Sequence, residues 1–210
     1  MDIAKLLRTF QARKRKIMGT ENYRKSAVLI PLLEKDGEIH ILFQVRSLHL
    51  HSQPGDICFP GGRIEKTDGG PEDCAIRETS EELGIPPSSI ADVIPFDYIV
   101  SDSGRMIFPY IGRIVHPEKI KPNEAEVAET FTVPLQYLLN TEPKMYKVHL
   151  QVLPEKDFPY HWIHGGKDYQ WGKRSIDELF YPYEDKVIWG LTAKILTYFL
   201  QEIKENQDNK

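Results

Sequence analysis

The feature that most constrains this chain is a glycine pair placed shortly before a strongly marked helix. Gly61 and Gly62 precede residues 71–84, whose ends carry helix-boundary signals. Pro71 suits the first helical position, where its missing N–H costs nothing, and Gly84 suits the left-handed position that ends a helix. The sequence therefore predicts a side-chain-free turn followed by a helix over residues 71–84.

Three glutamates share one side of that predicted helix. Glu78 lies three residues before Glu81 and four before Glu82, so their side chains project from neighbouring parts of one surface. Such like-charge pairs cost about 0.2–0.5 kcal/mol each in an isolated helix. Bound magnesium would reverse the sign, because hard cations prefer carboxylate oxygens. Glutamates alone would usually form only a solvated face, but the upstream glycines favour a metal site, with Arg77 placed to pair with Glu81.

The segment Arg77-Glu78-Thr79-Ser80-Glu81-Glu82-Leu83-Gly84-Ile85 resembles the second half of the Nudix hydrolase box, Arg-Glu-x-x-Glu-Glu-x-Gly-x. In the general pattern, five residues separate a glycine from a glutamate and seven separate that glutamate from the arginine; the first half departs from this. Five residues separate Gly62 from Asp68, and eight separate Asp68 from Arg77. One extra residue, and Asp in place of Glu, is the spacing of the coenzyme A pyrophosphatase branch of this family.

The segment before the box, residues 42–62, resembles the signature of the same branch. Arg46, Ser47, Gly55 and the run Phe59-Pro60-Gly61-Gly62 fall at the expected positions. Phe43, Gln44 and His51 replace a leucine, a threonine and an arginine of that signature. The last difference weakens the inference on substrate, because histidine lacks the bidentate fork that arginine offers to phosphate.

The resemblance implies an α/β Nudix fold, a mixed β-sheet sandwiched between α-helices (α/β/α). It also implies a site that holds Mg²⁺ or Mn²⁺. Alignment on Phe131 and Pro134 adds Glu126 to the acids that face the metal, with Glu129 in reserve. The implied catalytic residues are Glu78, Glu81 and Arg77; the implied metal ligands are Glu78, Glu81, Glu82, Glu126 and the carbonyl of Gly62; and the implied substrate-binding residues are Arg46, Ser47, Phe59, Gly61 and Gly62.

The implied reaction is metal-dependent hydrolysis of the diphosphate bond of coenzyme A or its thioesters, giving adenosine 3′,5′-bisphosphate and 4′-phosphopantetheine or its acyl derivative. Divalent cations suit this reaction because negative oxygens shield the phosphorus atoms from attack. One alternative is a Nudix pyrophosphatase acting on ADP-ribose, nucleotide sugars or another nucleoside diphosphate derivative. A second alternative is a non-catalytic module that senses a nucleotide. The choice between Glu78 and Glu81 as general base stays open.

Composition fits one ordinary domain with short extensions. The chain has 210 residues, 40% of them hydrophobic, and a net charge of −4, which argues against a general nucleic-acid partner. Two cysteines and no long apolar run favour a cytoplasmic protein with no membrane partner, and a homodimer is left open. We expect a basic amphipathic helix and linker over residues 1–25, a single Nudix domain over 26–200 and a polar tail over 201–210.

Other segments give coarser expectations. Aromatic residues between 160 and 171 more often pack together than line a pocket, although a pocket for adenine or pantetheine remains open. The expected strands cover residues 26–33, 38–46, 90–100 and 106–115, and residues 145–153 and 161–172 are expected to form an irregular strand-rich stretch. The expected outer helices cover residues 2–18, ending in a basic cluster, and 185–200, followed by a fraying tail. The aromatic set is Tyr160, His161, Trp162, Tyr169 and Trp171.

Overall fold

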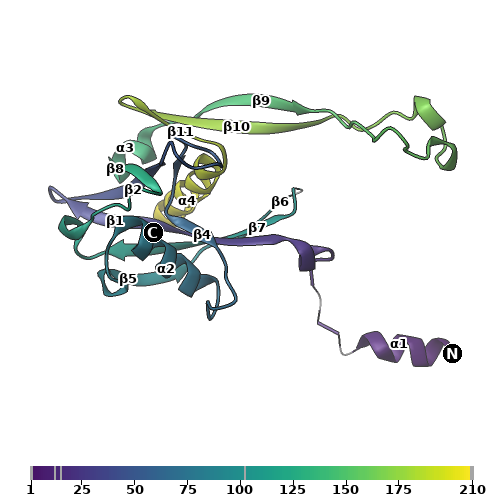
Figure 1. Cartoon of the computed structure of the whole chain (residues 1–210), viewed down its shortest axis with the longest axis horizontal. Coiled ribbons are helices and arrows are strands. Elements are labelled where there is room, and N and C mark those ends of the chain that lie inside the picture. Colours follow the sequence, from purple (N-terminus) through teal and green to yellow (C-terminus); the bar gives the residue numbers. More distant parts are fainter. Residues whose placement is uncertain (1, 12, 15, 102, 209–210) are drawn as a thin grey trace.

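A computed structural model describes residues 2–11, 13–14, 16–101 and 103–208 (Figure 1). The helices are α1 (Ile3–Gln11), α2 (Pro71–Leu83), α3 (Leu135–Asn140) and α4 (Gly190–Asp208). The strands are β1 (Arg24–Lys35), β2 (Glu38–Arg46), β3 (Ile57–Cys58), β4 (Gly61–Arg63), β5 (Ile90–Pro95), β6 (Ile99–Ser101), β7 (Arg105–Ile114), β8 (Val127–Pro134), β9 (Lys144–Leu150), β10 (Arg174–Tyr183) and β11 (Lys186–Trp189).

The main sheet is mixed, as predicted. Its central strand β1 pairs in parallel with β7 and antiparallel with β2 and β4. The remaining strands of this sheet, β3, β5, β6 and β8, join antiparallel to β2 or β7. Because β1 is buried on both faces, its sequence is a nearly continuous apolar run rather than an alternating one.

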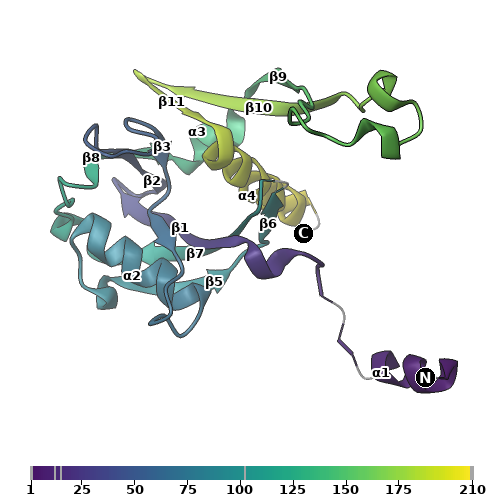
Figure 2. The same cartoon turned by 45° about the vertical axis from the view of Figure 1, so that its right-hand side comes forward.

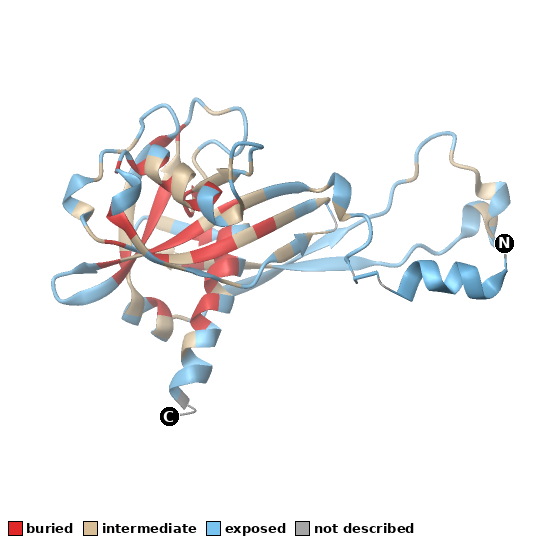
Figure 3. Cartoon of the chain, turned by 90° about the horizontal axis from the view of Figure 1, so that it is seen from below, coloured by how far each residue is buried: buried red, intermediate tan, exposed pale blue. Residues whose placement is uncertain are grey.

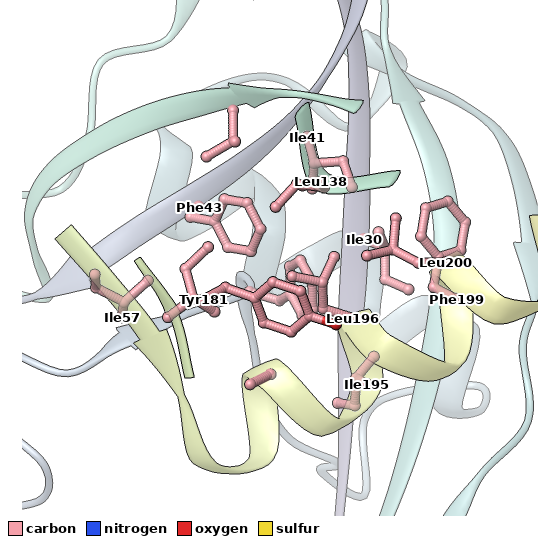
Figure 4. Close-up of a cluster of buried hydrophobic side chains, with 14 of the residues drawn as sticks. Ile30, Ile41, Phe43, Ile57, Leu138, Tyr181, Ile195, Leu196, Phe199 and Leu200 are labelled. Atoms are coloured by element: carbon pink, nitrogen blue, oxygen red, sulfur yellow. The ribbon is translucent and has the colours of Figure 1, made fainter. Parts of the chain in front are cut away.

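Helices cover both faces of the main sheet, which confirms the predicted α/β/α sandwich. Successive β1 side chains point to opposite faces, so Leu29 packs with the helix α2 cluster and Ile30 with the helix α4 cluster. Figure 4 shows the α4 side, where Leu196 and Phe199 approach Ile30 and Phe43. The two helices lie on opposite sides of the sheet in Figures 1 and 2.

A second, three-stranded antiparallel sheet, in the order β11-β10-β9, is a feature that the sequence did not predict. Strands β9 and β10 extend far beyond the main sheet as an arm (Figure 1), and the segment 151–173 forms its tip. The aromatic set predicted between 160 and 171 lies at this tip. There Tyr169 stacks edge-on against Trp171, and His161 contacts Trp162, so these residues pack locally.

Several predicted boundaries are wrong. The N-terminal helix ends at Gln11 instead of residue 18; Ala12 and Arg15, within the predicted extent, lie outside the described residues. The short helix buries no side chain, so only weak local terms support it. Residues 90–100 form two strands rather than one. The closing helix begins at Gly190, after strand β11, and residues 201–208 continue it rather than fray.

The boundaries predicted for α2 are confirmed. Pro71 occupies the first turn, and Gly84 has the left-handed φ of 62°. The Gly84 N–H donates to the Ser80 carbonyl, and the Lys121 N–H donates to the Leu83 carbonyl. A Cβ atom at Gly84 would overlap the Lys121 carbonyl oxygen, so both the φ angle and the available space require glycine.

We predict that Gly84→Ala lowers the free energy of unfolding by about 1–3 kcal/mol, because the variant strains φ and pushes away the segment around Lys121. Urea unfolding followed by circular dichroism measures this change. Gly172→Ala is the matched control, since a Cβ atom there meets nothing within 4 Å. Equal stability of the two variants would contradict this account of the helix end.

Candidate active site

The site begins with the glycines of strand β4, which pair antiparallel with β1. Gly61 lies opposite Val28, and Gly62 lies opposite Ala27. Gly61 has a φ of 150°, and a Cβ atom there would overlap the Ala27 carbonyl oxygen. A Cβ atom at Gly62 would overlap the carboxyl group of Glu78. The glycines therefore let helix α2 approach β4 closely enough to place a carboxylate directly against the strand backbone.

Two of the predicted metal ligands meet at this contact. The Glu82 side chain is only 4% exposed, and its Oε2 accepts a hydrogen bond of 2.8 Å from the Gly61 N–H. The Glu78 side chain is also largely buried. Burial raises the pKa of Glu82 to about 7, and burial likewise raises the pKa of Glu78. Each of these shifts is increased by the negative charges of neighbouring glutamates.

Arg77 links the acids of this region. Its Nε and Nη2 donate to the two carboxylate oxygens of Asp68 at 2.8 and 3.1 Å. The same guanidinium lies 3.0 Å from Glu78 Oε1 and 3.2 Å from Glu81 Oε2. Hydrogen bonds from Arg77, and then from the Glu65 N–H, hold the pKa of Asp68 at about 2. Arg77 is therefore fixed by a partner that is ionised at neutral pH, and it in turn orients the glutamates.

Glu126 lies near the same acids, at the start of strand β8. Its negative charge raises the pKa of both Glu78 and Glu82, which places it within electrostatic range of them. Its carbonyl accepts a 2.8 Å hydrogen bond from the Ser47 N–H, so this part of the chain is tied to the end of β2. Glu129, the reserve candidate, instead forms an ion pair of 2.5 Å with Lys186. Because Glu129 is held by Lys186, we keep Glu126 as the proposed ligand.

The predicted substrate-binding residues divide into two groups. Arg46 ends β2 and donates from Nε and Nη2 to the Ser52 carbonyl, which holds the following loop. Ser47 is buried beside it. Phe59, by contrast, is 3% exposed and stacks on Phe43 at a centroid distance of 5.1 Å. Phe59 is therefore a core residue.

Gln44 is a feature of the site for which the sequence predicted no role. It is fully buried, its Nε2 donates to the Cys58 Sγ at 3.6 Å, and a hydrogen bond from it lowers the pKa of Glu82. The Oε1 atom of Gln44 has no hydrogen-bond partner. Burial raises the pKa of the Cys58 thiol to about 11, so this sulfur is a neutral neighbour of Glu82. The only sequence signal was that Gln44 replaces the threonine of the family signature.

The donor set suits a divalent cation, although the side chains are not yet gathered into a complete shell. Among the described residues, no three Asp, Glu, His or Cys side chains form a compact metal-binding group. Glu78 and Glu82 are brought together at the glycine strand, Glu126 lies within electrostatic range, and Glu81 is 57% exposed and turned toward Arg77. Two buried carboxylates beside a glycine backbone fit Mg²⁺, which keeps several water ligands and needs few protein ones.

The raised pKa of Glu82 predicts the pH dependence of stability in the metal-free protein. The folded state binds this proton more tightly than the unfolded state, whose ordinary pKa is 4.5. The free energy of unfolding in chelator should therefore fall as pH rises from about 4.5 to about 7, by roughly 1.4 kcal/mol per pH unit at most for this proton. Denaturant titrations across this range measure the slope.

The control is Glu82→Gln, which keeps an acceptor for the Gly61 N–H but cannot ionise. Its slope between about pH 4.5 and 7 should be smaller by close to one proton. Identical slopes for the two proteins would contradict the assignment of this proton to Glu82.

We further predict that Gly62→Ala weakens Mn²⁺ binding about tenfold or more, because the added methyl group displaces the Glu78 carboxylate. Isothermal titration calorimetry measures the affinity. Gly172→Ala, at a glycine with open space around it, is the control and should bind as the wild type does. Unchanged affinity in Gly62→Ala would separate the glycine contact from metal binding.

Comparison with known proteins identifies the family of this chain. The NUDIX domain family matches residues 23–155. The chain is 36% identical to the mouse protein named peroxisomal coenzyme A diphosphatase NUDT7, over 65% of this chain and 57% of that protein's length. It is 30% identical to the uncharacterized Nudix hydrolase NudL of Escherichia coli K12, over 84% of this chain and 81% of the relative.

Among solved structures, the Nudix hydrolase RenU from M. smegmatis has a TM-score of 0.45 at 23% identity, covering 54% of this chain and 72% of that one. The match to the NUDIX domain spans more than half of the chain and includes the glycine strand and all of helix α2. The chain belongs to the Nudix hydrolase family.

Proposed function

We propose that this protein hydrolyses the diphosphate bond of coenzyme A or its thioesters, with Mg²⁺ or Mn²⁺ as cofactor. The observation that carries the proposal is the pair of buried carboxylates, Glu78 and Glu82, held against the glycine strand. The spacing of the Nudix box and the 36% identity to a protein named as a coenzyme A diphosphatase support this substrate class. The products would be adenosine 3′,5′-bisphosphate and 4′-phosphopantetheine or its acyl derivative.

Glu78, Glu82, Glu126 and the Gly62 carbonyl are the residues that would hold the cation, with Glu81 available by rotation of its exposed side chain. When bound, the ion would neutralise the charge of the diphosphate and act as a Lewis acid. The Gly62 carbonyl is directed toward α2, where the Cys74 thiol lies 3.7 Å from its oxygen. It can therefore add a backbone oxygen ligand on the side that faces the glutamates.

The remaining steps belong to the side chains of α2. The carboxylate of Glu78 is confined by Gly62 and Arg77, which suits a fixed ligand. Glu81 is more exposed, and we propose it as the base that accepts the proton of the attacking water. Arg77, anchored on Asp68, holds both glutamates in orientation. It is a positioning residue, and its exchange for lysine would lose the two-point contact with Asp68.

A long substrate needs contacts beyond the diphosphate. Arg46 supplies positive charge at the end of β2, and the Ser47 N–H is bonded to the Glu126 carbonyl.

The substrate class decides between this proposal and its alternatives. A related pyrophosphatase would prefer ADP-ribose or a nucleotide sugar, and a sensing module would bind a nucleotide without hydrolysing it. The buried acids favour an enzyme over a sensor, because they serve no evident purpose in a protein that only binds an anion. No described helix is both long and apolar enough to cross a membrane. With only two cysteines in the sequence, we propose a cytoplasmic location.

With Mg²⁺ or Mn²⁺ present, we predict that coenzyme A and acetyl-coenzyme A are cleaved with a higher kcat/KM than ADP-ribose. Liquid chromatography of the products identifies the bond that is broken. Adenosine 3′,5′-bisphosphate from coenzyme A supports the proposal, whereas efficient cleavage of ADP-ribose alone would favour the first alternative. Binding without turnover of any diphosphate would favour the sensor.

In the same assay, Glu82→Gln should lower kcat by orders of magnitude with the fold intact, because the variant removes a buried carboxylate of the proposed metal site. Glu118→Gln, which alters an exposed acid outside this site, is the control and should keep wild-type kinetics. Near-normal turnover in Glu82→Gln would refute the role given to this residue.

A further inference from the structure

The arm of strands β9 and β10 has two chemically different faces. Paired residues on antiparallel strands project to the same side, so the register of the second sheet assigns each side chain to a face. The inner face carries Lys147 and Asp177 in an ion pair of 2.8 Å, together with His149 and Ser175. Nearer the body the same face carries Tyr181, which is buried in the core.

The outer face carries an exposed set of apolar side chains, with three charged residues among them. Tyr146, Phe180 and Trp189 form a row across the three strands, with the first two rings edge to face at 5.7 Å and the last two stacked at 6.0 Å. Aliphatic side chains continue the strip toward the arm tip and along β11. The outer strip consists of Tyr146, Val148, Leu150, Ile176, Phe180, Val187 and Trp189, and apart from Phe180 its members are between 42 and 62% exposed.

An arm surrounded by water would need polar residues on both faces, yet the outer face of this arm is largely apolar. Strand β9 is exposed along its whole length (Figure 3), and a two-stranded hairpin on its own is marginally stable in water. Beyond Met145 the inner face of the arm carries the polar residues Lys147, His149, Ser175 and Asp177, whereas the outer face is apolar apart from Arg174 and Glu178. Such alternation is typical of a sheet with one face covered by protein. The described part of the chain leaves this outer strip uncovered.

We propose that the outer strip is the interface of a homodimer, in which the second sheets of two copies pack face to face about a two-fold axis. In such an arrangement the same patch is used by both copies, so one strip needs no separate partner surface. The proposal is independent of the reaction proposed above, because the strip lies on the α4 side of the molecule, away from α2.

The size of the strip fits a second copy. A fully covered aromatic side chain loses about 150–250 Å² of accessible surface, so covering the exposed parts of this strip would remove roughly 500 Å² per copy before the rim is counted. A standard interface buries about 800 Å² per partner, and the central parts of homodimer interfaces are apolar.

The charged residues among the apolar ones also fit a second copy. Lys144, Arg174 and Glu178 share the outer face, each paired with a member of the strip, and a two-fold axis can bring Glu178 of one copy toward the basic residues of the other. A surface of anionic lipid would instead favour positive charges alone, because an acidic group repels the headgroups. The mixture of charges therefore favours protein over lipid as the occupant.

Sedimentation velocity of the full chain over a wide concentration range tests the proposal. We expect a species of twice the chain mass of 24.3 kDa. Val148→Lys should raise the dimer dissociation constant about tenfold or more, because it places a charge in the centre of the strip. Met145→Lys is the matched control: Met145 is on the same strand and 58% exposed but projects from the opposite face, so its variant should stay dimeric.

Two further measurements separate a lost dimer contact from a misfolded β9 in Val148→Lys. They are a second variant, Ile176→Lys on β10, and hydrogen exchange of the wild type. The β9 amides of the wild type should exchange faster on dilution. A wild type that is monomeric at every concentration would overturn the proposal, as would equal weakening by Met145→Lys and Val148→Lys. A monomer that binds phosphatidylglycerol vesicles through Val148 and Ile176 would also overturn it, with lipid as the occupant.

Discussion

The absence of side chains at Gly61 and Gly62 is the constraint on which the rest of the site depends. Strand β4 is short, yet its pairing with β1 fixes the backbone beside helix α2. Because no Cβ atom intervenes, the Glu78 carboxyl group occupies the space next to Gly62, and the Gly61 N–H reaches Glu82. The apolar face of α2, with Ala75 and Leu83 fully buried, holds the helix at this distance.

The close approach of helix α2 to strand β4 has an electrostatic cost that a cation would offset. Burial in this contact raises the pKa of Glu78 and Glu82, and the charge of Glu126 adds to both shifts. Arg77 compensates only part of the negative charge, since it is bound most closely to Asp68. A site with excess buried carboxylate is therefore suited to a divalent ion and to an anionic substrate that arrives with it.

Helix α2 was largely predictable from the sequence, because its signals are local. Proline at its start, glycine at its end and acids at fixed spacing each act within a few residues, and the structure has them as expected. The role of Asp68 as the anchor of Arg77, and the place of Gln44 beside Glu82, depend on strands brought together by the fold. Their contacts could not be read from spacing along the chain.

The second sheet was missed for a related reason. Strand β9 is exposed on both sides, and it pairs with β10 across the 23 residues from 151 to 173. That connection is far longer than the loop that marks a hairpin in a sequence. The two-residue turn between β10 and β11 was missed because residues 185–189 were assigned to the closing helix. The aromatic residues of that segment suggested a pocket or a core, and the structure places them in a small cluster at the end of the arm.

The central claim is that the glycine strand and the α2 glutamates form one site for a divalent cation. Crystals soaked in Mn²⁺ and measured for anomalous scattering test it most directly. The account predicts an anomalous peak between the carboxylates of Glu78 and Glu82, within ligand distance of the Gly62 carbonyl. A fully soaked crystal with no peak there, or with these carboxylates turned away from the Gly62 backbone, would contradict it.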